Sequence, residues 1–317
     1  MMNTRKLLPP LFAALFGLAT SAFAQTVTTE ATVARVNGAA TVTMPDGSTT
    51  ALAPGMKVPQ GATIKTGADG DVYLESHAGY VTAIKKDSEL SIDELSVTSN
   101  GGKVTEEKTL LNLKSGDMVA LLDPKKKAVN NYQVRTPKGV AAARGTVFTV
   151  SYRGGNYTLA VVRGQIQIIA GAGVTSDNGR GGQANQTGTT FTLNAGQATF
   201  SNPGDQTYQT PFPLSDLSKQ GQNAVAQFLS VAIATVAVAA ENNIGGTTSE
   251  ELKSVTTALV AAYPAAADQI SALVKASAPT QASVVDQVIT TTTGTTPPAT
   301  PVTTPQPIDP STVSRSN

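Results

Sequence analysis

Cysteine and tryptophan are absent from this sequence of 317 residues, which contains a single histidine, His77. The absence of cysteine excludes disulfide bonds, iron–sulfur clusters, thiolate zinc sites and cysteine nucleophiles. One histidine excludes metal sites with several histidine ligands, and a Ser-His-Asp triad would have to use His77. Carboxylate-pair chemistry is not excluded, because the chain has 22 aspartate and glutamate residues.

Charged residues are also scarce, at 14% of the chain, and aromatic residues make up 5%. Lys and Arg total 23 against 22 for Asp and Glu, which gives a formal net charge of +1. A nucleic-acid-binding surface normally needs a basic excess, so we expect no nucleic-acid partner. The 28 glycines and 18 prolines are typical of turns that join short strands.

The N-terminal segment has the pattern of an export signal. A positively charged pair at residues 5–6 precedes an apolar run over residues 7–19. Small residues then stand at the two positions that a signal peptidase reads, which predicts a signal peptide over residues 1–24 with cleavage between Ala24 and Gln25. The apolar run is shorter than the ~20 residues that span a bilayer. We therefore expect an exported protein.

Residues 25–205 read as one all-β unit. Short runs rich in Val, Ile and Thr are separated by turn signals such as Asn37-Gly38. About 14 short strands at this spacing predict a jelly-roll-like β-sandwich rather than a parallel sheet. Residues 171–190 are rich in glycine, and we expect a long mobile loop there between late strands.

After a linker over residues 206–213, the apolar residues follow helical spacing over residues 214–289. The most apolar stretch, residues 224–240, is either a membrane span or a buried helix. It covers roughly 25 Å as a helix, against ~30 Å of hydrocarbon in a bilayer. We favour the buried helix and expect no transmembrane helix in the mature chain.

A weak repeat with a spacing of 15 residues aligns Ser249, Pro264 and Pro279 as helix starts. Each copy is too short to be a stable helix alone, so the copies must pack on each other or on the β unit. Residues 290–317 are rich in threonine and proline and cannot bury a core. We expect this tail to be disordered.

Few residues are candidates for catalysis or metal binding. His77 falls in a predicted turn, where a solvated surface residue is the favoured interpretation. The acidic residues within 69–75 lack the spacing of a calcium loop, so they predict a solvated turn. Asp93 and Glu94 point to opposite faces if they lie on a strand, which makes them a poor acid–base pair. We predict no catalytic residues, no cofactor and no metal site, and hence no enzyme.

A basic run, Lys125-Lys126-Lys127, follows Asp123-Pro124 in a predicted loop. Two interpretations stay open. With Lys138 and Arg144 nearby in sequence, the run can attract an anionic polymer or surface. Alternatively, its charges keep a loop from pairing with another strand edge.

One stretch is more specific than composition. Residues 132–150 read YQVRTPKGVAAARGTVFTV. This stretch resembles the signature of the FecR domain family, "V-x-T-P-x-x-V-x-x-x-R-G-T-x-F-x-V", and flanking elements extend the resemblance over about residues 55–200. The signature residues that match are Thr136, Pro137, Arg144, Gly145, Thr146 and Phe148.

These residues also have physical roles that do not depend on the family. Pro137 favours an extended backbone before it, and Gly145 permits a bulge or a close backbone approach. Phe148 is expected in the core, with Thr149 facing out on the other side of the strand. Arg144 either hydrogen-bonds loop carbonyls and holds the corner, which we favour, or meets an anionic ligand.

The resemblance implies a bacterial protein with a jelly-roll-like β fold. In its best-known setting, a FecR-like domain is the periplasmic part of an iron-siderophore regulator. That regulator has a cytoplasmic anti-sigma segment, one membrane helix and a C-terminal domain that meets an outer-membrane transporter. This chain departs from that plan, since only six residues precede the apolar run and the C-terminal part is helical.

The leading hypothesis is therefore a non-enzymatic binding module in the periplasm or at the cell surface. Its expected partner is an envelope protein or a cell-envelope polymer. One alternative is the periplasmic sensor component of a FecR-type sigma-factor regulatory system. A less favoured alternative is a carbohydrate-active protein with a pair of acids. The sequence leaves the oligomeric state open.

Overall fold

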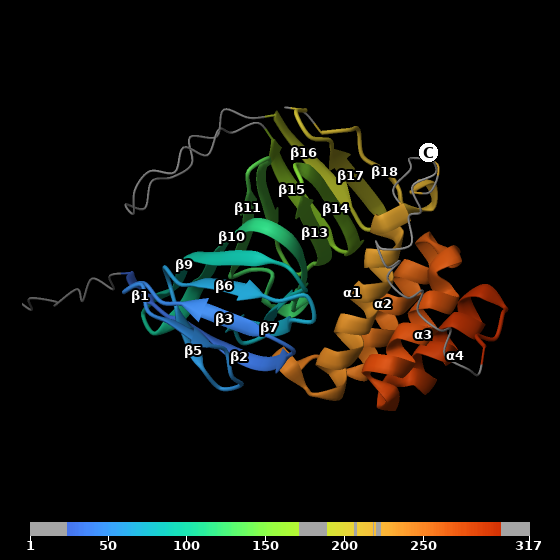
Figure 1. Cartoon of the computed structure of the whole chain (residues 1–317), viewed down its shortest axis with the longest axis horizontal. Coiled ribbons are helices and arrows are strands. Elements are labelled where there is room, and N and C mark those ends of the chain that lie inside the picture. The colour runs from blue at the N-terminus through green and yellow to red at the C-terminus, as the bar shows by residue number, and fades with distance from the viewer. Residues whose placement is uncertain (1–23, 171–188, 206–207, 218, 220–222, 299–317) are drawn as a thin grey trace, which may run out of the picture.

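A computed structural model describes residues 24–170, 189–205, 208–217, 219 and 223–298 (Figure 1). Strands fill the N-terminal part of the chain and helices the C-terminal part. The expectation of a mainly β fold followed by a small helical region is confirmed. Residues 1–23 of the predicted signal peptide, which spans residues 1–24, lie outside the described residues.

The strands lie in two layers, sheet A and sheet B, that share the 20-residue strand β10 (Lys103–Leu122). All neighbours are antiparallel except β10 and β11. From edge to edge, sheet A consists of β4 (Thr49–Ala51), β3 (Ala40–Thr43), β6 (Thr63–Thr66), β9 (Glu89–Asn100), β10, β11 (Asn130–Thr136), β12 (Gly139–Ala143), β15 (Gln165–Ala170) and β16 (Thr189–Asn194).

Sheet B has its own order around β10. From edge to edge, it consists of β5 (Lys57–Pro59), β2 (Glu30–Asn37), β7 (Asp71–His77), β8 (Tyr80–Ile84), β10, β13 (Val147–Arg153), β14 (Asn156–Arg163), β17 (Gln197–Ser201) and β18 (Phe212–Pro213). A further strand, β1 (Gln25–Thr28), pairs with the second half of β9 in sheet A.

Strand β10 passes from one sheet to the other at Gly116. Its first part pairs with β9 as far as Ser115, and its last part pairs with β13 from Gly116 onward. Gly116 has a φ of +99°, a conformation that glycine adopts without strain. A Cβ atom at this position would also lie 2.5 Å from the Cα and Cβ atoms of Ser88. The crossover therefore requires glycine.

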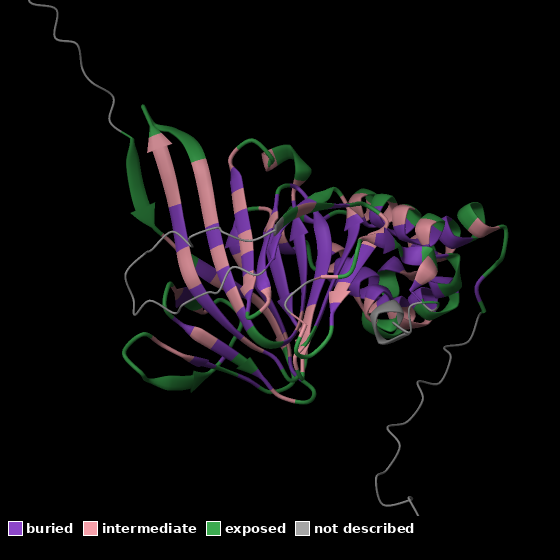
Figure 2. Cartoon of the chain, turned by 90° about the horizontal axis from the view of Figure 1, so that it is seen from above, coloured by how far each residue is buried: buried purple, intermediate pink, exposed green. Residues whose placement is uncertain are grey.

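Two hydrophobic cores lie on the two faces of sheet B. The first fills the space between the sheets and includes Tyr132 and Phe148. The second joins the outer face of sheet B, with Val119 and Val162, to the helices, with Ile233. The buried segments in Figure 2 accordingly continue from the strands into the helical layer. The molecule thus has three layers: sheet A, sheet B and helices.

The helical layer consists of α1 (Asn223–Glu241), α2 (Ser249–Ala262), α3 (Ala267–Ser277) and α4 (Ala282–Thr293). Short 3₁₀ turns begin at Pro264 and Pro279 and lead into α3 and α4, and α2 begins at Ser249, so all three repeat positions start helical segments. Among the described residues no single helix is long and apolar enough to span a membrane, although α2 with Pro264–Ser277 meets that criterion as a pair bent by 119°.

One expectation was wrong, and two others fall partly on residues that the structure does not describe. Thr149 was expected to face outward but is 1% exposed, because the helical layer covers that face of sheet B. The glycine-rich loop falls largely on residues 171–188, which lie outside the described part of the chain. Helix α4 continues to Thr293, into the Thr/Pro-rich tail, and residues 299–317 of that tail lie outside the described residues.

Candidate interaction surfaces

The first half of the FecR-like signature forms the hairpin turn between β11 and β12. Thr136 is buried, and its hydroxyl donates to the Gly139 carbonyl (3.3 Å) and accepts from the Lys138 amide (3.3 Å). Pro137 is exposed at the turn itself. The threonine therefore ties the ends of the turn together, while the proline restricts its backbone.

The second half of the signature forms a corner between β12 and β13. Gly145 has a φ of +64°, and a Cβ atom there would lie 2.7 Å from the Cα of Pro124. Thr146 is buried, and its hydroxyl donates to the Gln165 carbonyl (3.1 Å). Phe148 is fully buried, as expected. These residues fix the corner against the 3₁₀ turn η1 (Pro124–Lys126) and against β15.

Arg144 lies on this corner but does not hold it together. Its side chain is exposed and has no hydrogen-bond or ion-pair partner among the residues that the structure describes. The same is true of Lys125 and Lys127 on the neighbouring turn. We call Lys125, Lys127 and Arg144 the basic corner. The exposed position of Arg144 supports the second interpretation of this residue, contact with an anionic group.

Packing brings the basic corner together. Because Gly145 touches Pro124, the Cα atoms of Arg144 and Lys125 lie within about 12 Å of each other. The one carboxylate built into the turn, Asp123, accepts a hydrogen bond from the Lys125 amide (2.8 Å). Three cations that have no ion-pair partner in the described part of the chain lie on two adjacent turns, and they make a local positive surface on a chain whose overall charge is close to neutral.

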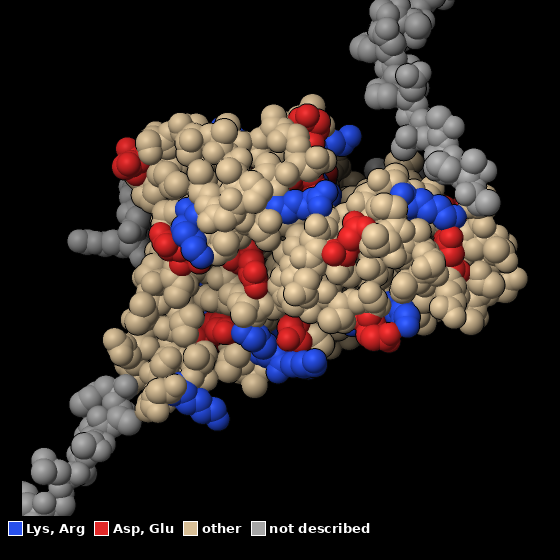
Figure 3. All heavy atoms as spheres, turned by 90° about the horizontal axis from the view of Figure 1, so that it is seen from below, with Lys and Arg blue, Asp and Glu red and all other residues tan. Residues whose placement is uncertain are grey.

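The other lysines near this corner are occupied. Lys126 forms an ion pair with Glu107 (3.0 Å) and lies 5.5 Å from the centre of the Tyr80 ring. Lys138, which is close to the run in sequence, donates instead to the carbonyls of Asn202 and Asp205. Elsewhere, Figure 3 shows basic and acidic side chains interleaved over one face of the molecule, without a broad area of one sign.

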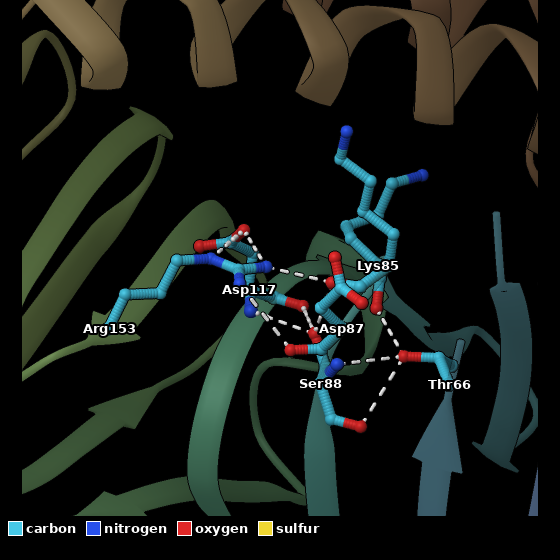
Figure 4. Close-up of polar contacts among 7 residues, drawn as sticks. Thr66, Lys85, Asp87, Ser88, Asp117 and Arg153 are labelled. Carbon is cyan, nitrogen blue, oxygen red and sulfur yellow. Dashed lines mark hydrogen bonds and ion pairs between the residues drawn. The ribbon is translucent and has the colours of Figure 1, made fainter. Parts of the chain in front are cut away.

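A second polar cluster braces the point where β10 changes sheets (Figure 4). Arg153 forms an ion pair with Asp117 (2.7 Å) and donates to the carbonyls of Lys86 (2.7 Å) and Asp87 (3.4 Å). The Ser88 hydroxyl accepts from the Asp117 amide (3.0 Å) and lies 3.2 Å from the Asp117 carbonyl. These bonds satisfy the turn between β8 and β9, so their role is structural.

The same turn also connects sheet B to the helices through Lys85. Its ammonium group forms an ion pair with Asp71 (2.8 Å), donates to the hydroxyl of Thr235 on α1 (3.1 Å) and lies 5.6 Å from the Tyr73 ring centre. Tyr73 is 1% exposed, and burial raises the pKa of its phenol far above the usual value. Lys85 and Asp71 therefore form a half-buried polar joint within an apolar interface.

Two further polar contacts link the β unit to the helices. Arg163 on β14 forms an ion pair with Glu251 in the first turn of α2 (2.6 Å). Arg35 on β2 donates to the Asn242 side chain at the end of α1 (3.3 Å). With the apolar core beneath them, these contacts fix the position of the helical layer on sheet B.

The remaining sequence candidates occupy structural positions. His77 was expected to be a solvated surface residue, but it is only 8% exposed at the end of β7. Tyr80 and strand β10 cover its side chain. Burial lowers the pKa of its imidazole, whose Nε2 lies 3.1 Å from the Lys108 carbonyl. Asp93 pairs with Arg135 (2.9 Å). Among the described residues, no group of three or more acidic or histidine side chains is arranged to hold a metal ion.

The two-layer β unit with a helical layer on one face places the chain among β-sandwich proteins. Residues 62–167 match the family model described as FecR protein, so this part of the chain is a FecR domain. The matched stretch contains both turns of the basic corner and the whole of β10. It ends before the helical layer begins.

Two solved structures from Parabacteroides distasonis ATCC 8503, each described as a candidate anti-sigma factor, are similar to this chain at 10% identity. The first has a TM-score of 0.30, with 60% of this chain covered and 59% of that chain. The second has a TM-score of 0.30, with 65% and 73% covered. No curated protein matches the sequence.

Proposed function

We propose that this protein is an exported, non-enzymatic binding module whose FecR domain contacts an anionic polymer of the bacterial envelope. The observation that carries the proposal is the basic corner. Lys125, Lys127 and Arg144 are exposed and unpaired among the described residues, and the Pro124–Gly145 contact holds their two turns together. An exported chain meets such a polymer in the periplasm or at the cell surface.

The chemistry of this surface favours binding over catalysis. Guanidinium and ammonium groups donate strongly to phosphate and carboxylate oxygens, and Arg does so with two parallel bonds. Three of the acidic residues singled out in the sequence form ion pairs: Asp71 with Lys85, Asp93 with Arg135 and Glu94 with Lys108. Within the described ranges the basic corner has no such partner, so its charge is available to a ligand.

Binding of purified lipopolysaccharide tests this function, because its phosphates are anionic. The variant Lys125→Gln/Lys127→Gln/Arg144→Gln removes three positive charges from the corner. Each cation near an anionic surface contributes about 1 kcal/mol, so we expect roughly 100-fold weaker binding at low salt. Uncharged dextran is expected not to bind.

The matched control removes the same charge elsewhere, through Lys86→Gln/Lys103→Gln/Lys219→Gln, three exposed lysines outside the basic corner. We expect this control to bind like the unmodified protein. Equal loss of binding in the two triple variants would show that only net charge matters. That result, or the absence of binding by the unmodified protein, would overturn the proposal.

A sensor role in sigma-factor regulation is the second candidate, and the FecR family match favours it. In that case, deletion of the gene alters transcription of a neighbouring sigma-factor operon. Transcript profiling of the deletion strain distinguishes the two roles. An unchanged profile, with retained lipopolysaccharide binding, leaves the binding module as the function.

A further inference from the structure

Strand β1 forms a free edge of the β unit. In the described part of the chain it pairs only with β9, from Gln25 opposite Ser99 to Thr28 opposite Ser96. All four of its residues are exposed. Figure 1 places it at the end of the molecule far from the helices. Its outer edge is therefore open to another strand.

One hydrogen bond shows which backbone groups of β1 face β9 and which face away from the molecule. The amide of Thr29 donates to the Leu95 carbonyl of β9 (3.0 Å). Because backbone groups alternate in direction along an antiparallel strand, Val27 also faces β9. The backbone N–H and C=O groups of Thr26 and Thr28 then point outward, away from the molecule.

This edge lacks the features that usually keep strand edges apart. Charged side chains, proline and bulges normally protect exposed edges, yet residues 25–29 contain no charged side chain and no proline. By contrast, the short edge strand β5 of sheet B carries Lys57 and Pro59. An open, uncharged edge favours pairing with another strand.

Apolar exposure is concentrated at the same place. Val27, at 50%, and Val104, at 37%, are the exposed large hydrophobic residues of the described chain. Val27 lies opposite Val97, and Val104 lies opposite Ser99, two residues further along β9. Residues that face each other, and residues two apart on a strand, share a face. The three valines therefore form one apolar strip across β10, β9 and β1.

We propose that β1 of a second copy of this chain pairs antiparallel with this edge, about a two-fold axis that passes through Val27. Thr26 of each copy then lies opposite Thr28 of the other, and their outward N–H and C=O groups form four hydrogen bonds. Val27 meets the same residue of the second copy in a non-hydrogen-bonded pair, with about 4.5 Å between the Cα atoms.

A second copy fits this edge because the strand is complementary to itself. The register places threonine opposite threonine and valine opposite valine, and no like charges face each other. Pairing continues sheet A across the axis and covers Val27, the most exposed large hydrophobic residue. The uncharged edge strand β16 is different, since its Phe191 already packs against Tyr208 within the molecule.

Cysteine cross-linking tests the register directly, because the chain contains no native cysteine. In Val27→Cys the two sulfurs lie across the axis, at a Cα separation suited to a disulfide. We expect mild oxidation to give a covalent dimer at least tenfold faster than for Thr26→Cys, on the opposite face, or Thr192→Cys, on β16. Similar rates for the three variants, or fastest cross-linking of Thr192→Cys, would overturn the proposal.

Analytical ultracentrifugation of the exported protein supplies the second measurement. We expect reversible dimers at concentrations between about 10 µM and 1 mM, as for a small interface. Thr28→Pro removes an outward N–H group that the single chain does not use, so it should weaken dimerisation at least tenfold with little change in melting temperature. A monomer throughout this range, or a dimer that Thr28→Pro leaves unchanged, contradicts the pairing.

Discussion

The substitution Gly116→Ala tests whether β10 requires glycine at the point where it passes from sheet A to sheet B. An alanine at a φ of +99° costs about 1–2 kcal/mol from backbone strain alone. Its Cβ would also displace Ser88, whose hydroxyl bonds to the Asp117 amide and to the Lys86 carbonyl. Loss of these two bonds adds about 1 kcal/mol each, so we expect a total of about 3–4 kcal/mol.

Gly47→Ala is the matched control, because Gly47 has a φ of +84° but no atom within 4 Å of an added Cβ. It carries the backbone strain without the collision. Urea unfolding followed by circular dichroism gives both free energies of unfolding. We expect Gly116→Ala to be less stable than Gly47→Ala by about 2 kcal/mol, with Ser88→Gly partly restoring stability in the Gly116→Ala background. Equal destabilisation by the two alanines would refute the reasoning.

Three further predictions concern the helical layer and the buried histidine. In a double-mutant cycle with Arg163→Met and Glu251→Gln, urea unfolding should give a coupling free energy of about 1–2 kcal/mol, and a value near zero would contradict this joint. Ile233→Ala should lower the free energy of unfolding by about 2–5 kcal/mol, because this side chain is fully buried against sheet B, whereas a loss below 1 kcal/mol would show loose packing. Burial lowers the His77 pKa below 6.5, so the unfolded chain binds the proton more tightly and stability should fall as the pH drops below about 6.5. His77→Gln should remove that part of the pH dependence, and an unchanged pH profile would refute the assignment.

The sequence predicted the features that depend on local pattern. Ser249, Pro264 and Pro279 start helical segments because the first turn of a helix accepts serine and proline. The signature between residues 132 and 150 identified the domain because R-G-T-x-F is specific. Phe148 is buried as expected, since a strand alternates its faces.

Features that depend on packing between distant segments could not be predicted in this way. Thr149 and His77 are buried because other layers cover them, which no local pattern indicates. Strand β10 passes between two sheets at Gly116, which packs closely against Ser88 in the turn between β8 and β9. The basic corner unites Arg144 and the 125–127 run through the Pro124–Gly145 contact, and only the structure places these segments together.

The central claim is that the FecR domain binds an anionic envelope polymer through its basic corner, and Arg144 provides the most direct test. We compare the affinity of the unmodified protein, Arg144→Gln and Lys86→Gln for purified lipopolysaccharide by isothermal titration calorimetry at low salt. Loss of one cation at the surface predicts about fivefold weaker binding for Arg144→Gln and no change for Lys86→Gln. Equal affinities for Arg144→Gln and the unmodified protein would contradict the account.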